Sequence, residues 1–447
     1  MRVKTLSKGL KLTLGLGIVM SMITVFPLWS DASATGRNAC SRLPSQPATT
    51  RVPAQATDVV LEWNQQAAAL SILPASALAP VQQTRVMAIV QVAVHDAVNG
   101  ITGEYETYLS PSSAPEGASP EAAAIAAAHH TLKNLFSGSD TLLDDRYVNS
   151  LAANGLSPLD PGIEYGRSAA AAILSLRAGD HASEAQFNYD APGAGDPGVW
   201  VRLNNAPALL PGFGNVTPFV LRSGSQFRPE PPPARDSEQY ARDYNEIKQI
   251  GIATGSTRSL EQSQIATFWR ASPTAIWNNV LTQVVLTRNL DLSAKARVFA
   301  LFYLAAADAS IACWDAKYAY NFWRPQAAIR SGDFDDNDLT AGNATWQPFV
   351  GTPPHPEYPS GHTANSSAMA KILVSEFGDN PGVPIAVTLT GITRSWNSFS
   401  EAVEEVIDAR VYSGIHFRNS DKVGARMGGQ IAQFVSKHAL RKRAKSH

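Results

Sequence analysis

Residues 293–323, SAKARVFALFYLAAADASIACWDAKYAYNFW, decide the fold class. Apolar residues fill this stretch at helical spacing, without the alternation typical of a strand. The sequence therefore predicts one long apolar helix. Its last part carries Lys317 among aromatic residues, and Arg324 and Pro325 follow directly.

Helical patterns continue on both sides of this segment, and no run shows sustained strand alternation. Nine Pro and six Gly in residues 183–236 predict an extended loop region, and residues 331–358 a second irregular stretch. The other predicted helices cover residues 81–98, 120–136, 161–178, 237–250, 260–270, 273–286, 361–377, 399–409 and 422–438.

This order predicts an all-α fold in which two helical bundles pack as one unit. We expect the first bundle in residues 35–182, the connecting region in 183–236 and the second bundle, carrying the site, in 237–440. Residues 441–447 read as a basic tail.

Charge and composition exclude several classes of protein. The 37 Lys and Arg balance 38 Asp and Glu, so the net charge of −1 gives no general case for nucleic-acid binding. With 17% charged and 44% hydrophobic residues, the chain is globular.

Residues 1–34 resemble a secretory signal peptide, with four basic residues, an apolar stretch and an Ala-Ser-Ala cleavage site. The rival reading is an uncleaved membrane anchor. We expect cleavage, no stable membrane anchor, and a secreted or periplasmic product. Export permits a disulfide between Cys40 and Cys313, and two unpaired thiols are the alternative.

The first candidate site segment contains Lys317 and Arg324, seven residues apart. On a continuous helix this spacing places both on one face. Pro325 biases Arg324 away from helical geometry, so its guanidinium is expected at a helix end. The aromatic surroundings indicate burial, and the segment offers only Asp315 as an anionic partner.

Two further segments carry polar groups at helix boundaries. Ser360 is a good N-cap, and Gly361 and His362 open the helix that follows. Arg410 and His416 point apart on a continuous helix, but Gly414 between them offers a break after which they converge.

Each segment alone is ordinary, since such residues are commonly a solvated face, a capped turn or a chance spacing. Together they supply Lys, two Arg, a hydroxyl, a backbone N–H and two imidazoles, an inventory that suits a tetrahedral oxyanion.

These three segments fit K-x6-R-P, P-S-G-H and R-x5-H. With them the chain resembles the superfamily of vanadium-dependent haloperoxidases and type 2 phosphatidic acid phosphatases. The resemblance covers residues 297–429 closely, and the helix bearing His95 and Asp96 is similar to one in haloperoxidases.

The resemblance implies vanadate as the cofactor. Lys317, Arg324, Ser360, Gly361 and Arg410 would bind its oxygens, and the imidazole of His416 would bond to vanadium. His362 would be the acid–base group that takes a proton from hydrogen peroxide. Halide oxidation to hypohalous acid would follow, with an unspecified organic acceptor. Association into a homo-oligomer is left open.

His355, seven residues before His362, is His in bromoperoxidases of the family and Phe in the chloride-oxidising branch. Trp314 matches a Trp beside the halide pocket of that branch. We interpret this mixture as a preference for bromide or iodide. The alternative is that His355 only packs in a Pro-rich loop.

An acid phosphatase with a phosphohistidine intermediate is the alternative function, and a non-catalytic helical binding protein is the third. The pattern departs from the phosphatases, because Ala409 precedes Arg410 where they usually carry Ser. Ser420 stands where the superfamily often has Asp, with Asp421 one residue later. This leaves open what binds the second nitrogen of His416. For His95 and Asp96 we expect a satisfied buried pair.

Overall fold

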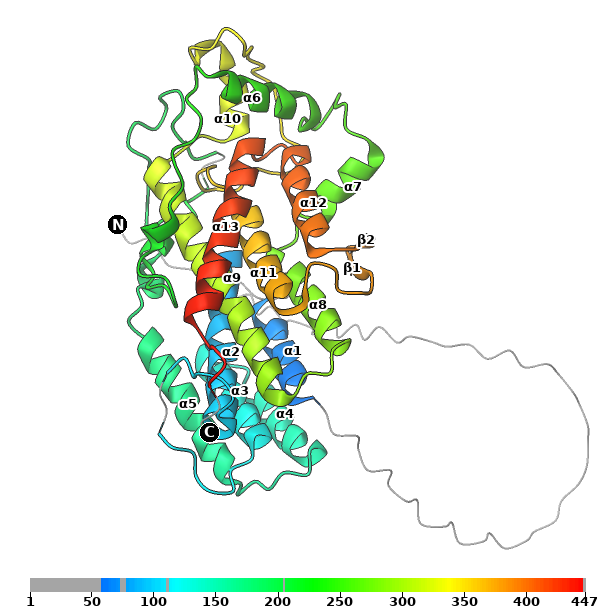
Figure 1. Cartoon of the computed structure of the whole chain (residues 1–447). Helices are drawn as coiled ribbons and strands as arrows, with labels where there is room; N and C mark the ends of the chain where they lie inside the picture. Colours follow the sequence, from blue (N-terminus) through cyan, green and yellow to red (C-terminus); the bar gives the residue numbers. More distant parts are fainter. Residues whose placement is uncertain (1–57, 73–77, 110–111, 204–205, 445–447) are drawn as a thin grey trace, which may run out of the picture. The chain divides into compact units, whose positions relative to one another are not determined.

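Helices form almost all of the regular structure in this computed structural model, which describes residues 58–72, 78–109, 112–203 and 206–444 (Figure 1). The predicted signal peptide and Cys40 lie outside the described residues. Cys313 is buried and has no disulfide partner among the described residues, so the two alternatives for this cysteine pair stay untested.

Five helices form the first half of the described chain. Pro occupies the first turn of three of them, where its missing N–H costs no intrahelical hydrogen bond. The three predicted helices are confirmed, and α1 and α4 were not predicted. The helices are α1 (Val59–Ser71), α2 (Pro80–Thr102), α3 (Pro120–Leu135), α4 (Asp140–Ala153) and α5 (Pro161–Arg177).

The connecting region is irregular as predicted, with only the short 3-10 turns η1 (Ala182–Glu184), η2 (Phe213–Asn215) and η3 (Gly224–Phe227). Asp308, on the long helix of the second half, fixes this region to the core. Its carboxylate accepts the backbone N–H groups of Phe219, Val220 and Leu221 at 2.6, 2.8 and 2.9 Å.

The second half adds eight helices to the part of the chain described here. Seven of the eight were predicted, with ends that lie within four residues of the observed ones, and α10 was not predicted. They are α6 (Glu238–Ile250), α7 (Leu260–Phe268), α8 (Pro273–Leu286), α9 (Leu292–Tyr320), α10 (Pro325–Arg330), α11 (Gly361–Phe377), α12 (Phe399–Tyr412) and α13 (Arg418–His438), with the turn η4 (Gly332–Phe334).

One antiparallel hairpin, β1 (Ile385–Leu389) and β2 (Ile392–Trp396), interrupts the helical pattern and was missed. Leu389 pairs with Ile392 across a two-residue turn of Thr390 and Gly391, both at positive φ (50° and 79°). Such turns match the twist of paired strands.

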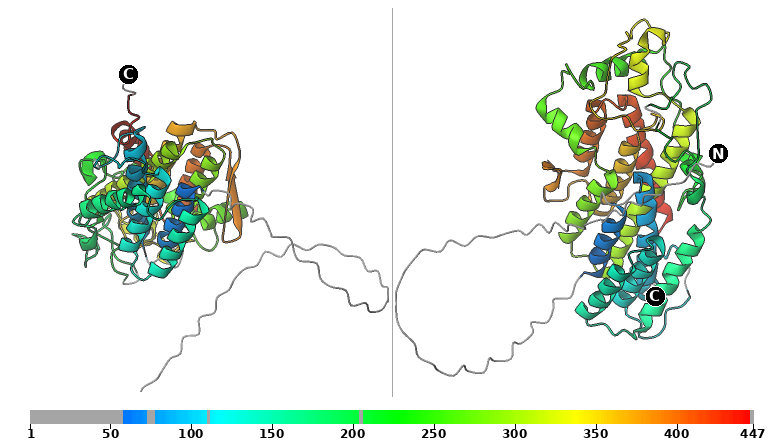
Figure 2. Two further views of the ribbon diagram at one scale, coloured as in Figure 1. Left: turned by 90° about the horizontal axis from the view of Figure 1, so that it is seen from below. Right: turned by 180° about the vertical axis from the view of Figure 1, so that it is seen from behind.

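The long helix α9 is the core of the fold. It packs against α2 from the first half and against α11 and α13 from the second (Figures 1 and 2). Among the described residues it is the one helix long and apolar enough to cross a membrane, but 94% of that window is buried inside the protein. Packing against helices of both halves therefore accounts for its apolar sequence.

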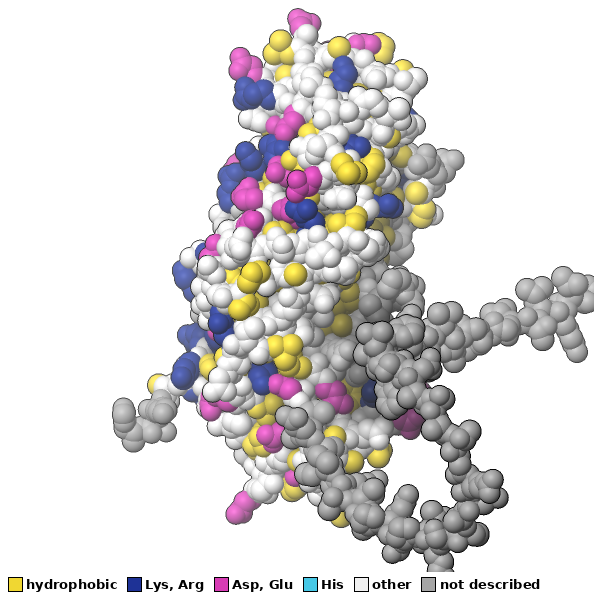
Figure 3. All heavy atoms as spheres, turned by 90° about the vertical axis from the view of Figure 1, so that its right-hand side faces the viewer, with side chains coloured by type: hydrophobic (Ala, Val, Ile, Leu, Met, Phe, Trp, Pro, Cys, Tyr) yellow, Lys and Arg dark blue, Asp and Glu magenta, His cyan; other side chains and the backbone are white. Residues whose placement is uncertain are grey.

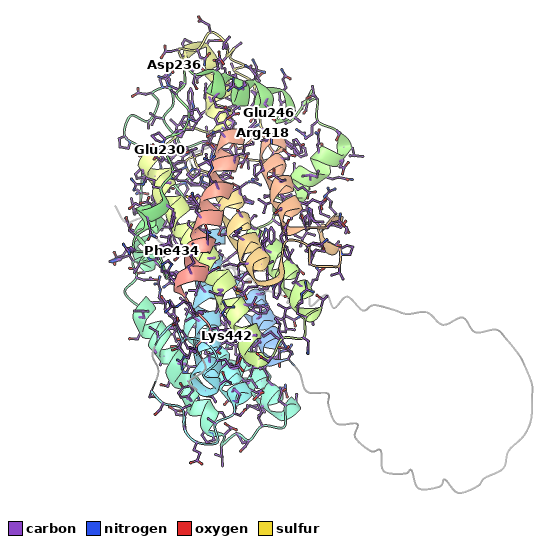
Figure 4. All side chains as sticks on the ribbon, viewed as in Figure 1. Glu230, Asp236, Glu246, Arg418, Phe434 and Lys442 are labelled. Atoms are coloured by element: carbon purple, nitrogen blue, oxygen red, sulfur yellow. The ribbon has the colours of Figure 1, made fainter. Side chains whose placement is uncertain are left out.

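Charges of both signs mix on the surface. On the face shown in Figure 3, basic and acidic side chains lie among each other. Arg418, at the start of α13, pairs with Glu246 of α6 at 2.7 Å (Figure 4). In the basic tail, Arg441 pairs with Glu106 at 2.7 Å, while residues 445–447 lie outside the described part.

Candidate active site

The three sequence segments meet around one cavity of about 160 Å³. Six of the predicted site residues line it: Trp314, His355, Gly361, His362, Arg410 and His416. Pro80 and Val81 of α2 also line it, so the first half of the chain contributes to the wall. The remaining three, Lys317, Arg324 and Ser360, are buried next to it.

The first segment is not one continuous helix, so the prediction that a single helix carries Lys317 and Arg324 on one face is wrong. Helix α9 ends at Tyr320, and Asn321 turns the chain with a left-handed φ of 48°. Arg324 is extended and directly precedes α10, as Pro325 predicts. Lys317 and Arg324 therefore approach the site from a helix end and from a loop.

Lys317 and Arg324 both donate hydrogen bonds to backbone carbonyls of the loop that precedes Ser360. The Lys317 ammonium donates to the carbonyls of Pro356 and Glu357 at 2.9 and 2.8 Å. Arg324 donates from Nε to the His355 carbonyl at 2.8 Å and from Nη1 to the Ile415 carbonyl at 2.9 Å. Asp315 does not neutralise them, because it pairs with Arg228 at 2.7 Å.

Ser360 is the residue before α11, as predicted, but its side chain makes no capping hydrogen bond. Its buried Oγ has no hydrogen-bond partner among the described residues, and its backbone N–H donates to the Ser420 carbonyl at 3.1 Å. A Cβ on Gly361 would lie 3.3 Å from the Trp314 ring, so glycine lets α11 begin close to this ring, and Gly361 itself lines the cavity.

The third segment folds as predicted. Helix α12 ends at Tyr412, and Gly414 adopts a left-handed φ of 79°. A Cβ there would lie 2.4 Å from the Gly251 carbonyl oxygen. This break brings Arg410 and His416 to one cavity. Arg410 donates from Nη1 to the Trp269 carbonyl at 2.8 Å, while its buried Nε has no partner.

Glu357 is the functional residue that sequence reasoning missed. His416 Nδ1 lies 2.8 Å from Glu357 Oε1, and Ser420 Oγ donates to Glu357 Oε2 at 2.5 Å. The Glu357 carboxyl group is therefore the partner of the second ring nitrogen of His416, which the sequence had left open. The available signal was an acidic residue in an otherwise apolar, Pro-rich segment three residues before Ser360.

Burial favours the neutral form of all three imidazoles. Burial, and secondly the nearby Arg and Lys charges, lower the pKa of His355, His362 and His416 well below the usual value. His355 accepts from Arg324 Nη2 at Nδ1 (2.9 Å) and packs on Trp314 with ring centroids 4.9 Å apart. The structure therefore brings both predicted halide-pocket residues together.

The site contains more buried basic side chains than buried acidic ones. Burial raises the pKa of Glu357 to about 7, and the pKa of Asp421 well above its usual range. Both Asp421 oxygens lack a hydrogen-bond partner, although Ser360 faces this carboxyl closely enough to lower its pKa. Burial also lowers the pKa of Lys317 to about 7 and those of Arg324 and Arg410 to about 10. A buried anion would relieve the desolvation of all three cations.

This donor set fits an oxyanion such as vanadate. The unpartnered Ser360 Oγ and Arg410 Nε are free to bind oxygens, and His416 Nε2 carries a lone pair. The described ranges contain no group of three or more His, Cys, Asp or Glu that could hold a metal ion.

His95 and Asp96 lie elsewhere and hold a loop. His95 Nε2 contacts the Glu106 carbonyl at 3.0 Å, and Asp96 accepts the backbone N–H groups of Tyr108 and Leu109 at 2.6 and 2.8 Å. Both are buried and hydrogen-bonded, but with separate partners.

Fold and site together define a helical-bundle protein with a buried cationic oxyanion pocket. Residues 297–445 match the family described as VCPO second helical-bundle domain. The chain is 24% identical over 400 residues to the vanadium chloroperoxidase of Curvularia inaequalis, covering 71% of this chain and 65% of that protein's length.

Solved structures of vanadium-dependent haloperoxidases are similar to this chain as well. A bacterial vanadium-dependent iodoperoxidase is 27% identical, with a TM-score of 0.74 over 87% of this chain and 97% of that one. A holo-type bacterial vanadium-dependent chloroperoxidase, 18% identical, shares the fold with a TM-score of 0.64 over 85% and 97%. These matches support the vanadium haloperoxidase superfamily for this chain.

Proposed function

We propose that this chain is an exported vanadate-dependent haloperoxidase that oxidises bromide or iodide with hydrogen peroxide to hypohalous acid. The observation that carries the proposal is the meeting of Arg410, His362 and His416 at one cavity whose neighbouring donors lack partners. Vanadate, when bound, supplies an electrophilic centre that activates peroxide toward a halide without a change of metal oxidation state.

The residues of the chain have distinct tasks in this proposal. Lys317, Arg324, Arg410, Ser360 and the N-terminus of α11 at Gly361 bind the oxygens of vanadate. Arg324 Nη1 lies 3.2 Å from His416 Nε2, the ring nitrogen that would hold vanadium.

His362 would accept a proton from hydrogen peroxide. Its ring lines the cavity, and its Nε2 lies 3.3 Å from the Ala271 carbonyl oxygen. A carbonyl only accepts, so in the neutral ring this contact leaves the lone pair on Nδ1, and that nitrogen would be the general base. His355 and Trp314 form the adjacent wall proposed for the halide.

A peroxidase assay tests the proposal. Purified protein with vanadate, peroxide and each halide in turn should brominate or iodinate a phenol dye, and His362→Ala should abolish turnover while vanadate still binds. Undiminished turnover of that variant would refute the role of His362. No turnover with any halide, despite bound vanadate, would refute the function.

The acid phosphatase is the competing outcome, because the same lone pair on His416 Nε2 also serves a nucleophile. Hydrolysis of a phosphate monoester, inhibited by vanadate, would identify it. Export is tested separately, by N-terminal sequencing of the secreted or periplasmic protein for loss of residues 1–34.

A further inference from the structure

The acid that orients His416 comes from a different segment than the superfamily pattern suggests. Position 420, four residues after the histidine, carries Ser, and the carboxyl of Asp421 makes no hydrogen bond to the ring. Glu357, 59 residues earlier in the chain, contacts Nδ1 instead.

Two contacts fix the tautomer of His416. In its ionised form Glu357 only accepts hydrogen bonds, and its 2.8 Å contact through Oε1 then requires a proton on Nδ1. A guanidinium only donates, so the 3.2 Å contact with Arg324 Nη1 requires a lone pair on Nε2. The nitrogen that faces the cavity is thus the one able to bind vanadium.

Glu357 is itself held rigidly. Its Oε1 also accepts the backbone N–H of Phe417 at 3.0 Å, its Oε2 accepts from Ser420 Oγ at 2.5 Å, and its side chain is fully buried. Lys317 donates to its backbone carbonyl at 2.8 Å. Together these hydrogen bonds support one orientation of the carboxylate.

We propose that Glu357 is the positioning residue for His416, and that Ser420 is the small hydroxyl partner that makes room for its carboxylate. In this chain the carboxyl partner of the imidazole thus lies at position 357, and position 420 supplies a hydroxyl that contacts it. This inference deepens the proposed function and rests on it for the identity of the bound oxyanion.

This arrangement predicts that an acid introduced at position 420 compensates for the loss of the acid at position 357. Ser420 Oγ and Glu357 Oε2 are in direct contact, so an Asp at 420 would occupy the space of the Glu357 carboxylate. Glu357→Ala should weaken vanadate binding 10- to 100-fold, the usual effect of losing the partner of a ligating His. Ser420→Asp alone should also weaken it, because two carboxylates would then share one buried place. The double variant Glu357→Ala/Ser420→Asp should bind vanadate more tightly than either single variant.

Glu357→Gln separates orientation from charge. The amide oxygen can still accept from Nδ1 and from Phe417, while its NH₂ donates to Ser420 Oγ. This variant should keep the Nδ1–H tautomer and lose only part of the affinity. Asp308→Asn is the matched control, since Asp308 is equally buried and accepts three N–H groups far from His416. It should lower the unfolding temperature and leave vanadate affinity unchanged.

The readouts are vanadate affinity, by calorimetry of the metal-free protein, and the ¹⁵N chemical shifts of the His416 ring without vanadate. The second readout tests the positioning role even if the proposed function fails. A folded Glu357→Ala protein with wild-type ring shifts overturns the inference, as does a folded double variant that binds no better than its parents. If Glu357→Ala does not fold, the comparison of Glu357→Gln, Ser420→Asp and the double variant decides.

Discussion

At the residue scale, the site is made of buried cations whose hydrogen bonds are incompletely used. Lys317 and Arg324 donate mainly to backbone carbonyls of the loop that precedes Ser360. In contrast, Arg410 Nε and Ser360 Oγ have no hydrogen-bond partner in the described chain. Leaving such groups unsatisfied costs about 1–3 kcal/mol each, so a bound oxyanion would recover that cost.

Arg410→Lys tests this directly. Lys keeps the positive charge but lacks the planar guanidinium. It therefore cannot donate to the Trp269 carbonyl and, at the same time, to a vanadate oxygen from the place that Nε occupies. We expect vanadate affinity to fall about 10- to 100-fold, corresponding to one hydrogen bond to a charged group. Arg418→Lys is the control, because Arg418 pairs with Glu246 and Asp408 and does not line the cavity. Equal affinities of the two variants would contradict the role of Arg410.

His95 gives a pH prediction outside the site. Burial lowers its pKa from 6.5 to about 4. Its stabilising effect is therefore complete above pH 6.5 and is lost as the pH falls toward 4, by about 3 kcal/mol in total. Urea unfolding of the wild type and His95→Gln at pH 7 and 4.5 should show a smaller pH effect in the variant. Asp96, whose pKa is raised to about 7, acts in the opposite direction but is present in both proteins. Parallel pH profiles would contradict the prediction.

At the element scale, most helices follow from local sequence, because caps and apolar spacing act within a few residues. Helix α11 begins and ends where predicted. Helix α4 was missed because it buries only Leu143, Ser150 and Leu151 and so has little apolar pattern. The hairpin was missed because each strand has only five residues, although Thr390 and Gly391 carried a turn signal.

The site could be predicted in part for the same reason. The spacings around Pro325 and Gly414 report local chain breaks, and both breaks are present. The contact between Glu357 and His416 joins two loops that only tertiary packing brings together, so no spacing rule reveals it.

The close packing of α13 on α11 gives an element-scale prediction. A Cβ on Gly428 would lie 2.0 Å from the Ala364 carbonyl oxygen, whereas one on Gly429 would meet only Ser367 Oγ, at 3.4 Å. Both changes gain about 1 kcal/mol of helix propensity. Gly428→Ala should nevertheless destabilise the protein by about 1–3 kcal/mol through overpacking, and Gly429→Ala should be neutral or stabilising. Thermal unfolding of the pair measures this, and equal effects would show that α11 and α13 are not so closely packed.

At the scale of the whole molecule, the two halves share α9 as a common core. Helix α2 packs on one part of it and α11 on another, and Pro80 and Val81 at the start of α2 reach the cavity wall. The first half therefore contributes to the site although all three motifs lie in the second.

This arrangement predicts how vanadate stabilises the chain. A ligand at 100 times its dissociation constant stabilises the folded state by about 2.7 kcal/mol. If the two halves unfold as one unit through α9, amides of α2 and α3 should gain hydrogen-exchange protection on vanadate binding, as those of α11 and α13 do. Arg410→Lys should lose the gain in both halves at the same vanadate concentration. Protection confined to residues 237–440 would instead show that the second bundle unfolds independently. The wall formed by Pro80 and Val81 would then be a contact between two separately stable bundles.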